Sequence, residues 1–372
     1  PRRPRVVIAH DYLTQLGGAE LVGLARARAF PGAPGVTTLD DPEGTYPEFK
    51  DLEVRVSPLN RVGLLRRSHR LALPVLAPTV GSMSIDADVV IASSSGWAHG
   101  FRTSGAMVVY CHSPARWLYL TDEYVGTGSG RHLKAAAVAT LKRPLVAWDG
   151  RAAARATCYL ANSTVVQERI GRVYGIDATI VPPPYGLAVD GDQQEVPEAA
   201  GWAEQGFHLS VSRLLPYKNV GAVVEAFRRL PQERLVIVGS GPMEAELRQT
   251  LPDTVRLVSG IDDRQLRWLY AHSRAVVAAS YEDFGLTPVE GMAFGKPTVA
   301  LRGGGYLDTV VEGLTGVFFE SPRPEDIATA VVAARSTTWD AVAIEAHAAS
   351  FSEPTFAATM RRIAERATES DL

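Results

Sequence analysis

Short runs of apolar and β-branched residues recur along the chain, and amphipathic segments of helix length separate them. This alternation is typical of βα units, whose parallel strands are buried on both faces of a sheet. It predicts two doubly wound halves. The strands expected in the first half are 5–10, 36–39, 54–58, 89–95, 107–113, 158–163 and 179–184, and those in the second half are 207–213, 234–241, 255–260, 275–280, 297–304 and 316–320.

The segment between the two halves is rich in Pro, Gly and acidic residues and lacks apolar periodicity, which favours a linker. We therefore predict a first Rossmann-like domain over 1–186, a linker over 187–206 and a second domain over 207–350. A length of 372 residues fits two domains of ordinary size.

Composition excludes several classes of protein. A net charge of −3 gives no overall attraction to polyanions, so a dedicated nucleic-acid binder is not expected. The two cysteines, Cys111 and Cys158, lie in apolar runs without CxxC spacing, which gives no support for a disulfide framework or a zinc site. With no signal peptide or membrane span in the sequence, we expect a cytoplasmic protein.

Ligands of open α/β sheets bind beyond the carboxyl ends of the strands, so we expect the functional residues to lie there. Gly239 and Gly241 follow one strand, but the third small residue of the dinucleotide fingerprint is replaced by Glu244, which argues against a dehydrogenase. Arg213 and Lys218 follow another strand, where two cations can hold a diphosphate through charge-assisted hydrogen bonds. Two solvated loop cations are the alternative.

The first half offers a histidine and a glycine turn at strand ends. His112 can orient or polarise a hydroxyl near neutral pH, although a lone histidine is more often structural. Gly17 and Gly18 begin a helix whose first amides form an anion site. Asp86 and Asp88 have a spacing used for divalent ions, but they precede a strand, so we expect them to be structural and expect no metal.

The stretch SYEDFGLTPVEG, residues 280–291, contains two glutamates with different explanations. Thr287 as N-cap, with Pro288 and Glu290 after it, fits a capping box. Glu282 lies before the turn and has no such explanation. The amides of Phe284, Gly285 and Leu286 are expected to point along the new helix axis toward a bound phosphate.

Together these motifs resemble the retaining glycosyltransferases of family four, which have the GT-B fold of two Rossmann-like domains facing each other across a cleft. The resemblance covers nearly the whole chain. The motifs that carry it are GGAE (17–20), YCHSP (110–114), SRLLPYKN (212–219), VGSGP (238–242), EDFGLTPVE (282–290) and GKPTVALRGGG (295–305).

The resemblance implies a role for each matching residue. Arg213 and Lys218 would hold the donor diphosphate, and Gly17 and Gly18 would lie against it. Glu290 would bind the ribose, and His112 would orient the donor sugar and the acceptor. The other donor contacts implied are those of Glu282, of the backbone at Phe284, Gly285 and Leu286, and of Gly239, Gly260 and Ile261, the last two beside the base.

The family also implies its chemistry and the path of the chain end. Residues 351–372 would form a terminal helix that crosses back to the first domain. The reaction would be metal-independent front-face transfer of a hexose with retention, and the donor would be GDP-mannose, with a UDP sugar or an epimerase or hydrolase as alternatives. Asp308 stands where the family has Glu, so its contact with the donor is left open.

The sequence says less about the sugar acceptor and about where in the cell the protein acts. A lipid-linked sugar, a polysaccharide end and a secondary-metabolite core all remain acceptors compatible with the sequence. The segment 61–73 is basic, with apolar residues at roughly helical spacing, which indicates either contact with anionic lipid at the inner membrane surface or a solvated helix face.

Overall fold

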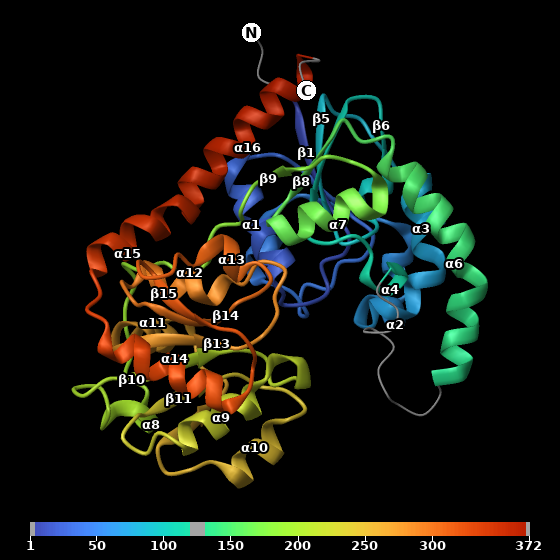
Figure 1. Ribbon diagram of the computed structural model, residues 1–372. Helices are drawn as coiled ribbons and strands as arrows, with labels where there is room; N and C mark the ends of the chain where they lie inside the picture. Colours follow the sequence, from blue (N-terminus) through green and yellow to red (C-terminus); the bar gives the residue numbers. More distant parts are fainter. Residues whose placement is uncertain (1–3, 120–130, 370–372) are drawn as a thin grey trace. The chain divides into compact units, whose positions relative to one another are not determined.

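The computed structural model describes residues 4–119 and 131–369, and the chain divides into two compact units (Figure 1). The first unit comprises Pro1–Pro184 together with Glu353–Leu372, and the second comprises Tyr185–Ser352. Residues 187–206 belong to the second unit and do not form a free linker. Leu187, Val196 and Ala199 are buried in its core, and Pro197–Ala200 forms helix α8.

The main sheet of the first unit is parallel, with the strand order β3-β2-β1-β5-β7-β8-β9. Its strands coincide with the predicted apolar runs, since each run is buried between two layers of helices. A short parallel pair, β4 (Ser84–Ile85) with β6 (Arg102–Thr103), was not predicted. The strand bounds are β1 Val6–His10, β2 Gly35–Thr37, β3 Val54–Val56, β5 Val89–Ser94, β7 Ala106–Cys111, β8 Cys158–Ala161 and β9 Thr179–Ile180.

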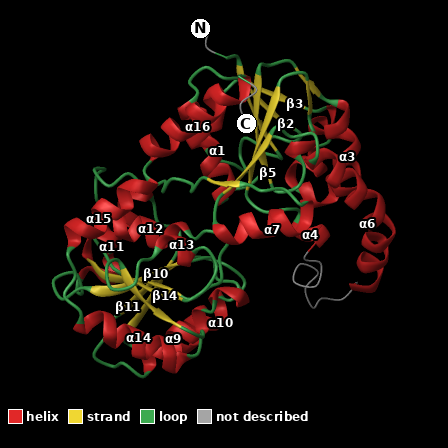
Figure 2. Ribbon diagram, turned by 45° about the horizontal axis from the view of Figure 1, so that its top comes forward, coloured by secondary structure: helices red, strands yellow, loops and turns green. Residues whose placement is uncertain are grey.

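Helices cover both faces of this sheet, and alternate residues along each strand point to opposite faces. Side chains from α3 (Leu73–Ser82), α6 (Arg131–Ala153) and α7 (Thr164–Tyr174) share one core cluster with Val90 and Val109. On the other face, α1 (Gly18–Ala29) lies beside α16 (Glu353–Thr368), as Figure 2 shows, and Met360 of α16 packs in the cluster that contains Tyr110.

The second unit repeats the arrangement around a parallel sheet with the order β12-β11-β10-β13-β14-β15. The order reverses between β10 and β13, which marks the point where ligands bind in such sheets. The strands are β10 Phe207–Val211, β11 Leu235–Val238, β12 Val255–Val258, β13 Ser273–Ala278, β14 Thr298–Leu301 and β15 Gly316–Phe319. The helices after α8 are α9 Val220–Arg228, α10 Glu244–Thr250, α11 Asp263–His272, α12 Leu286–Ala293, α13 Tyr306–Thr309, α14 Pro324–Ser336 and α15 Ala341–Ala348.

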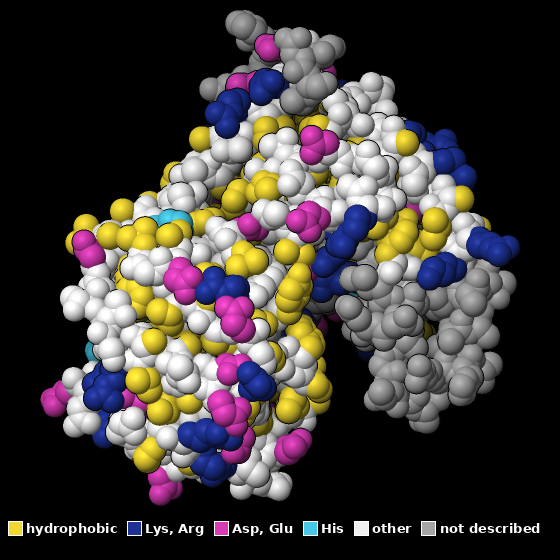
Figure 3. Space-filling view, in the orientation of Figure 1, with side chains coloured by type: hydrophobic (Ala, Val, Ile, Leu, Met, Phe, Trp, Pro, Cys, Tyr) yellow, Lys and Arg dark blue, Asp and Glu magenta, His cyan; other side chains and the backbone are white. Residues whose placement is uncertain are grey.

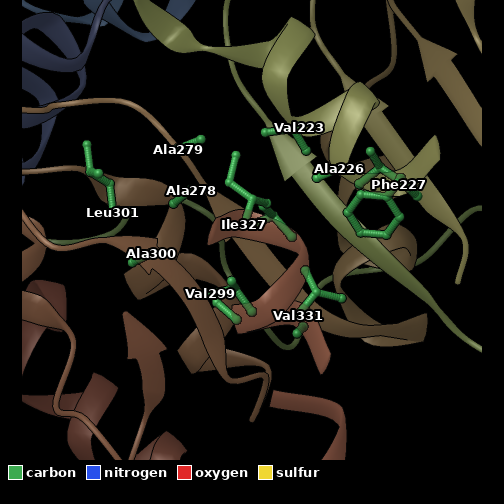
Figure 4. Close-up of a cluster of buried hydrophobic side chains, with 14 of the residues drawn as sticks. Val223, Ala226, Phe227, Ala278, Ala279, Val299, Ala300, Leu301, Ile327 and Val331 are labelled. Atoms are coloured by element: carbon green, nitrogen blue, oxygen red, sulfur yellow. The ribbon is translucent and has the colours of Figure 1, made fainter. Parts of the chain in front are cut away.

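The largest core cluster of the second unit lies between its sheet and helices α9 and α14. Figure 4 shows side chains of this cluster, among them Phe227 of α9, Val331 of α14 and Val299 of β14. On the opposite face, α11 contributes Leu269 and Tyr270 to a second cluster. The surface is charged but mixed: on the face that Figure 3 presents, acidic and basic side chains are interspersed over the second unit.

The basic segment 61–73 does not form one continuous helix. It is divided among a 3₁₀ turn that ends at Arg61, helix α2 (Gly63–Arg67), a second 3₁₀ turn (His69–Ala72) and the start of α3. Leu64 and Leu71 are nevertheless well exposed, at 67% and 54%. Within the described residues, no helix is long and apolar enough to cross a membrane.

Asp86 and Asp88 have structural roles, as expected from their place before a strand. Asp86 Oδ1 accepts a hydrogen bond from Arg5 Nη2 at 2.7 Å, and Asp88 Oδ2 accepts one from the Arg5 amide at 2.7 Å. Both contacts fix the start of β1 beside β5. In the part of the chain that the structure describes, no group of three or more His, Cys, Asp or Glu side chains has the arrangement of a metal site.

Candidate functional site

The carboxyl ends of β10 and β13 bring Lys218 and Glu282 together in the second unit. Lys218 Nζ donates to Glu282 Oε1, and the two side chains are 12% and 23% exposed. Ser280 Oγ donates to the same carboxylate oxygen at 2.6 Å. An ammonium has three N–H donors and Glu282 uses one of them, so Lys218 can also bind an anionic ligand.

Arg213 lies at the same edge and is exposed. Its Nη2 donates to Tyr217 Oη at 3.2 Å, and Lys218 Nζ lies 5.1 Å from the centroid of the Tyr217 ring. The turn between β10 and α9 is fixed by Asn219, which has φ 57° and donates from Nδ2 to the carbonyl of Ala279 at 2.8 Å. This contact ties the loop that carries the cations to the end of β13.

Helix α12 does not begin with the predicted capping box. Its N-cap is Gly285, at φ 86° and without a side-chain hydrogen bond, and the helix starts at Leu286. Thr287 Oγ1 instead donates to the carbonyl of Val211 at 3.3 Å. The first amides of α12 therefore have no side-chain cap from this residue, and they retain the capacity of a helix N-terminus to bind an anion.

Glu290 lies one turn inside α12 and contacts the adjacent helix rather than its own N-cap. Its Oε2 accepts a hydrogen bond from the Tyr270 hydroxyl of α11 at 2.8 Å. Burial raises the pKa of the Glu290 carboxyl; the Tyr270 hydrogen bond opposes this shift, and the charge of Asp263 adds to it. The turn at Gly260 and Ile261 directly precedes α11, the helix that carries Tyr270.

Close backbone packing explains the glycines around these residues. A Cβ at Gly239 would lie 1.9 Å from the carbonyl oxygen of Ser212, and one at Gly285 would lie 2.2 Å from Cε1 of Tyr306. The Tyr306 hydroxyl is 3.2 Å from Ser280 Oγ, so this buried ring supports both the helix start and the Ser280–Glu282 contact. The roles of Ser280 and Tyr306 were not predicted from the sequence, because their contact joins residues that are 26 positions apart.

A second group of polar residues lies at the carboxyl edge of the first unit. His112 follows β7, and its Nε2 is 2.9 Å from Ser93 Oγ on the neighbouring strand β5. Asp11, after β1, accepts hydrogen bonds from the amides of Ser95 and Ala98 at 2.6 Å each. Burial is the largest influence on the pKa of Asp11 and raises it.

Gly17 and Gly18 begin α1, as the sequence predicts. Gly17 is its N-cap in extended backbone, and a Cβ there would lie 2.4 Å from Oε2 of the buried Glu20. Glu20 Oε1 accepts from Gln15 Nε2 at 3.0 Å and lies 3.8 Å from His10 Nε2. The glycines thus provide helix-end amides, but with a carboxylate in the same first turn.

The structure therefore groups the predicted residues within each unit. Lys218, Glu282 and the start of α12 form one cluster, which we call the cation–carboxylate site; Arg213 flanks it. His112 and the Gly17–Gly18 turn lie at the corresponding edge of the first unit. Asp308 lies in the short helix α13, which directly follows the turn Gly303–Gly305.

Residues 192–336 match the family described as "Glycosyl transferases group 1". Two relatives are the D-inositol 3-phosphate glycosyltransferase 2 of Catenulispora acidiphila, 32% identical over 46% of this chain and 46% of that protein, and the alpha-1,3/1,6-mannosyltransferase ALG2 of Dictyostelium discoideum, 40% identical over 22% and 19%. The chain thus matches about half or less of the length of these relatives.

The fold has a close counterpart among solved structures. Anabaena Alr3699/HepE in complex with UDP-glucose aligns with a TM-score of 0.67 over 96% of this chain and 98% of that one, at 20% identity. The predicted fold class, α/β with two Rossmann-like domains of the GT-B type, is confirmed. Residues 192–336 of the second unit are thus similar to the glycosyl transferases of group 1, in agreement with the predicted enzyme class.

Proposed function

We propose that the protein is a retaining glycosyltransferase that moves a hexose from a sugar nucleotide to a hydroxyl acceptor with α linkage. The observation that carries the proposal is the cation–carboxylate site, in which Lys218 and Glu282 meet beside the uncapped start of α12. A nucleoside diphosphate requires positive charge and N–H donors at one place, and this site offers both.

Each residue has a place in the proposed reaction. Lys218, Arg213 and the amides of α12 stabilise the negative charge that develops on the departing diphosphate, without a metal ion. Glu282, held by Ser280, positions Lys218 and the donor sugar. Glu290, with one oxygen bonded to Tyr270, accepts from the ribose hydroxyls with its other oxygen.

The transfer itself is a front-face substitution. The acceptor oxygen forms a bond to the anomeric carbon while the bond from that carbon to the diphosphate oxygen breaks, and the acceptor proton passes to the departing diphosphate. No enzymic nucleophile is needed. His112, with Gly17 and Gly18, contributes from the first unit by orienting the sugar and the phosphate.

For the donor we propose GDP-mannose, as the sequence motifs imply, and a mannosyltransferase among the relatives agrees with mannose. A UDP sugar is the alternative, because the solved structure of similar fold holds UDP-glucose. An epimerase or hydrolase on the same fold is the other reaction class, and it is distinguished by product formed without an acceptor. The acceptor class stays open among a lipid-linked sugar, a polysaccharide end and a secondary-metabolite core.

We also propose that the protein is cytoplasmic and contacts anionic lipid at the inner membrane surface through residues 61–73. The exposed Leu64 and Leu71 stand beside Arg61 and Arg67 in this segment, and such a combination of apolar and basic groups suits a lipid surface. Vesicle binding tests this contact.

The experiment that tests the function is thermal unfolding with GDP, UDP, ADP and TDP, for the wild type and for Lys218→Ala. A ligand at a hundred times its Kd adds about 2.7 kcal/mol, and we expect such a shift with GDP only. Lys218→Ala should abolish it. The control is Lys296→Ala, which removes the same residue type before β14, at the opposite end of the sheet.

Each outcome has a defined meaning. A Lys218-dependent shift with UDP would replace the donor and keep the site, and a shift that survives in Lys218→Ala would contradict the role of the lysine. If no nucleotide shifts the melting temperature, the diphosphate site is wrong. Mannose transfer from GDP-mannose with retained anomeric configuration then completes the assignment.

A further inference from the structure

Arg26 of α1 is fully buried, which is unusual for an arginine, and it lies directly beneath the carboxyl edge that carries His112. The side chain crosses to the sheet, where its Nη2 donates to Ser93 Oγ and its Cζ lies 5.1 Å from the centroid of the Tyr110 ring. Its Nε and Nη1 have no hydrogen-bond partner. A buried cation satisfied at only one nitrogen is costly to the fold.

The electrostatics reflect the burial of Arg26. Burial lowers the pKa of Arg26 to about 10, while Coulombic interactions with Tyr110, Asp11 and Glu20 oppose the shift. The guanidinium is therefore still protonated at neutral pH. The register of the sheet fixes its surroundings, because Ser93 of β5 pairs with His10 of β1 on one side and with Tyr110 of β7 on the other.

The hydrogen bonds of Ser93 then determine the state of His112. A guanidinium donates and never accepts, so it occupies a lone pair of Ser93 Oγ and cannot take the hydroxyl proton. The acceptor at hydrogen-bond distance is His112 Nε2, at 2.9 Å. If Nε2 carried a proton instead, it could not accept this hydrogen bond. The buried hydroxyl of Ser93 would then be an unsatisfied donor, which costs free energy.

We propose that Arg26 is a positioning residue that acts through Ser93 to hold His112 as the neutral tautomer, with the ring proton on Nδ1. The inference rests on the proposed function of His112, because the tautomer gives this histidine a fixed N–H donor toward the donor sugar or the acceptor. A ring that changed tautomer or became charged would not present the same donor.

The charges around His112 favour the same state. Burial, followed by Arg26, His10 and Arg116, lowers the pKa of His112 well below its ordinary value. These groups come from α1, β1 and the short helix α4 (Arg116–Tyr119), and Tyr110 on β7 also lies beside the ring, 5.2 Å between centroids. Removing Arg26 leaves His10 and Arg116 in place but takes away the strongest Coulombic influence on the pKa of His112.

The test is ¹H–¹⁵N NMR of the intact protein with labelled histidines, in which the two neutral tautomers and the charged ring give distinct patterns; His112→Asn identifies the signal. The wild type should show the Nδ1-protonated ring throughout pH 6–8. Arg26→Met, which keeps the length of the side chain, should show mixed tautomers and a ring that becomes charged at higher pH. Arg28→Met is the control, because Arg28 lies on the same helix but pairs with Glu353 at the surface.

Ser93→Ala provides a second test if Arg26→Met does not fold. It should also mix the tautomers, although Arg26 stays in place. An Nε2-protonated ring in the wild type, or an unchanged tautomer in both variants, would overturn the proposal.

Kinetics separate positioning from structural damage. In Arg26→Met we expect kcat for transfer to fall by about tenfold at pH 8 and further as the pH is lowered, with the KM for the donor within about twofold of the wild type. Arg26→Lys should restore part of the loss. The NMR result does not depend on transferase activity. If none of the nucleotides shifted the melting temperature, the proposed function would be refuted, but the tautomer measurement would remain valid.

Discussion

Gly285 provides a sharp test of how the start of α12 is held. Its backbone has φ 86° and ψ 88°, a conformation that residues with a Cβ rarely adopt. A Cβ at this position would also lie 2.2 Å from Cε1 of Tyr306, a buried ring that is 3% exposed. Gly285→Ala therefore introduces two separate costs, backbone strain and a collision.

Gly313→Ala separates the cost of the backbone strain from the cost of the collision. Gly313 has φ 78°, but a Cβ there would meet nothing within 4 Å, so this variant has the backbone strain alone. Adopting the left-handed region costs about 1–2 kcal/mol. Overpacking adds about 1–3 kcal/mol, so Gly285→Ala should lose about 2–5 kcal/mol of unfolding free energy in total.

The assay is thermal unfolding of both variants, in which a domain of this size loses about 2–4 °C per kcal/mol. In a Tyr306→Leu background the collision is absent, and Gly285→Ala should then cost about as much as Gly313→Ala. Nucleotide binding should fail in Gly285→Ala and persist in Gly313→Ala. Equal losses for the two alanine variants in the wild-type background would refute the collision, and with it the account of how Tyr306 supports the helix.

Two further predictions concern Glu290 and the exposed segment 61–73. Because burial raises the pKa of Glu290, the folded protein binds this proton more tightly than the unfolded chain, and stability falls as the pH rises from the ordinary glutamate value through the raised one. Glu290→Gln should therefore melt at a higher temperature than the wild type at pH 7, with a smaller gain at pH 4, while binding nucleotide more weakly; an unchanged melting temperature would contradict the burial cost. Leu64→Ser should weaken flotation with phosphatidylglycerol vesicles by about tenfold, whereas Val342→Ser, which changes a residue 74% exposed in the second unit, should not; equal flotation of both variants would reject the lipid contact.

The layout of the sheets was predictable because each strand is a short, continuous apolar run between two helical layers. A run such as VVIA at 89–92 is buried throughout, as expected for a central strand of a parallel sheet. The positions of Lys218 and Glu282 at strand ends followed from the same argument. Their contact did not, because 64 residues separate them and only the sheet order brings them together.

Local patterns were misleading where tertiary contacts decide the outcome. Thr287 and Glu290 have the spacing of a capping box. Thr287 instead donates a hydrogen bond to the carbonyl of Val211, and Glu290 accepts one from the hydroxyl of Tyr270. The composition of 187–206 indicates a linker, and it cannot reveal that Val196 reaches a core. The sequence likewise gives no sign that Arg26 is buried while Arg28, two residues later, is at the surface.

Helix α16 makes the first unit discontinuous along the chain, and this sets an order for folding during synthesis. The second unit, Tyr185–Ser352, is complete before α16 has been translated. Until then the sheet surface around Tyr110 and Ile91 lacks the layer that Phe356 and Met360 supply, so the nascent first unit exposes apolar strands. A chain that ends after residue 352 would therefore contain the whole second unit, together with a first unit whose exposed apolar strands are sensitive to proteases and prone to aggregate.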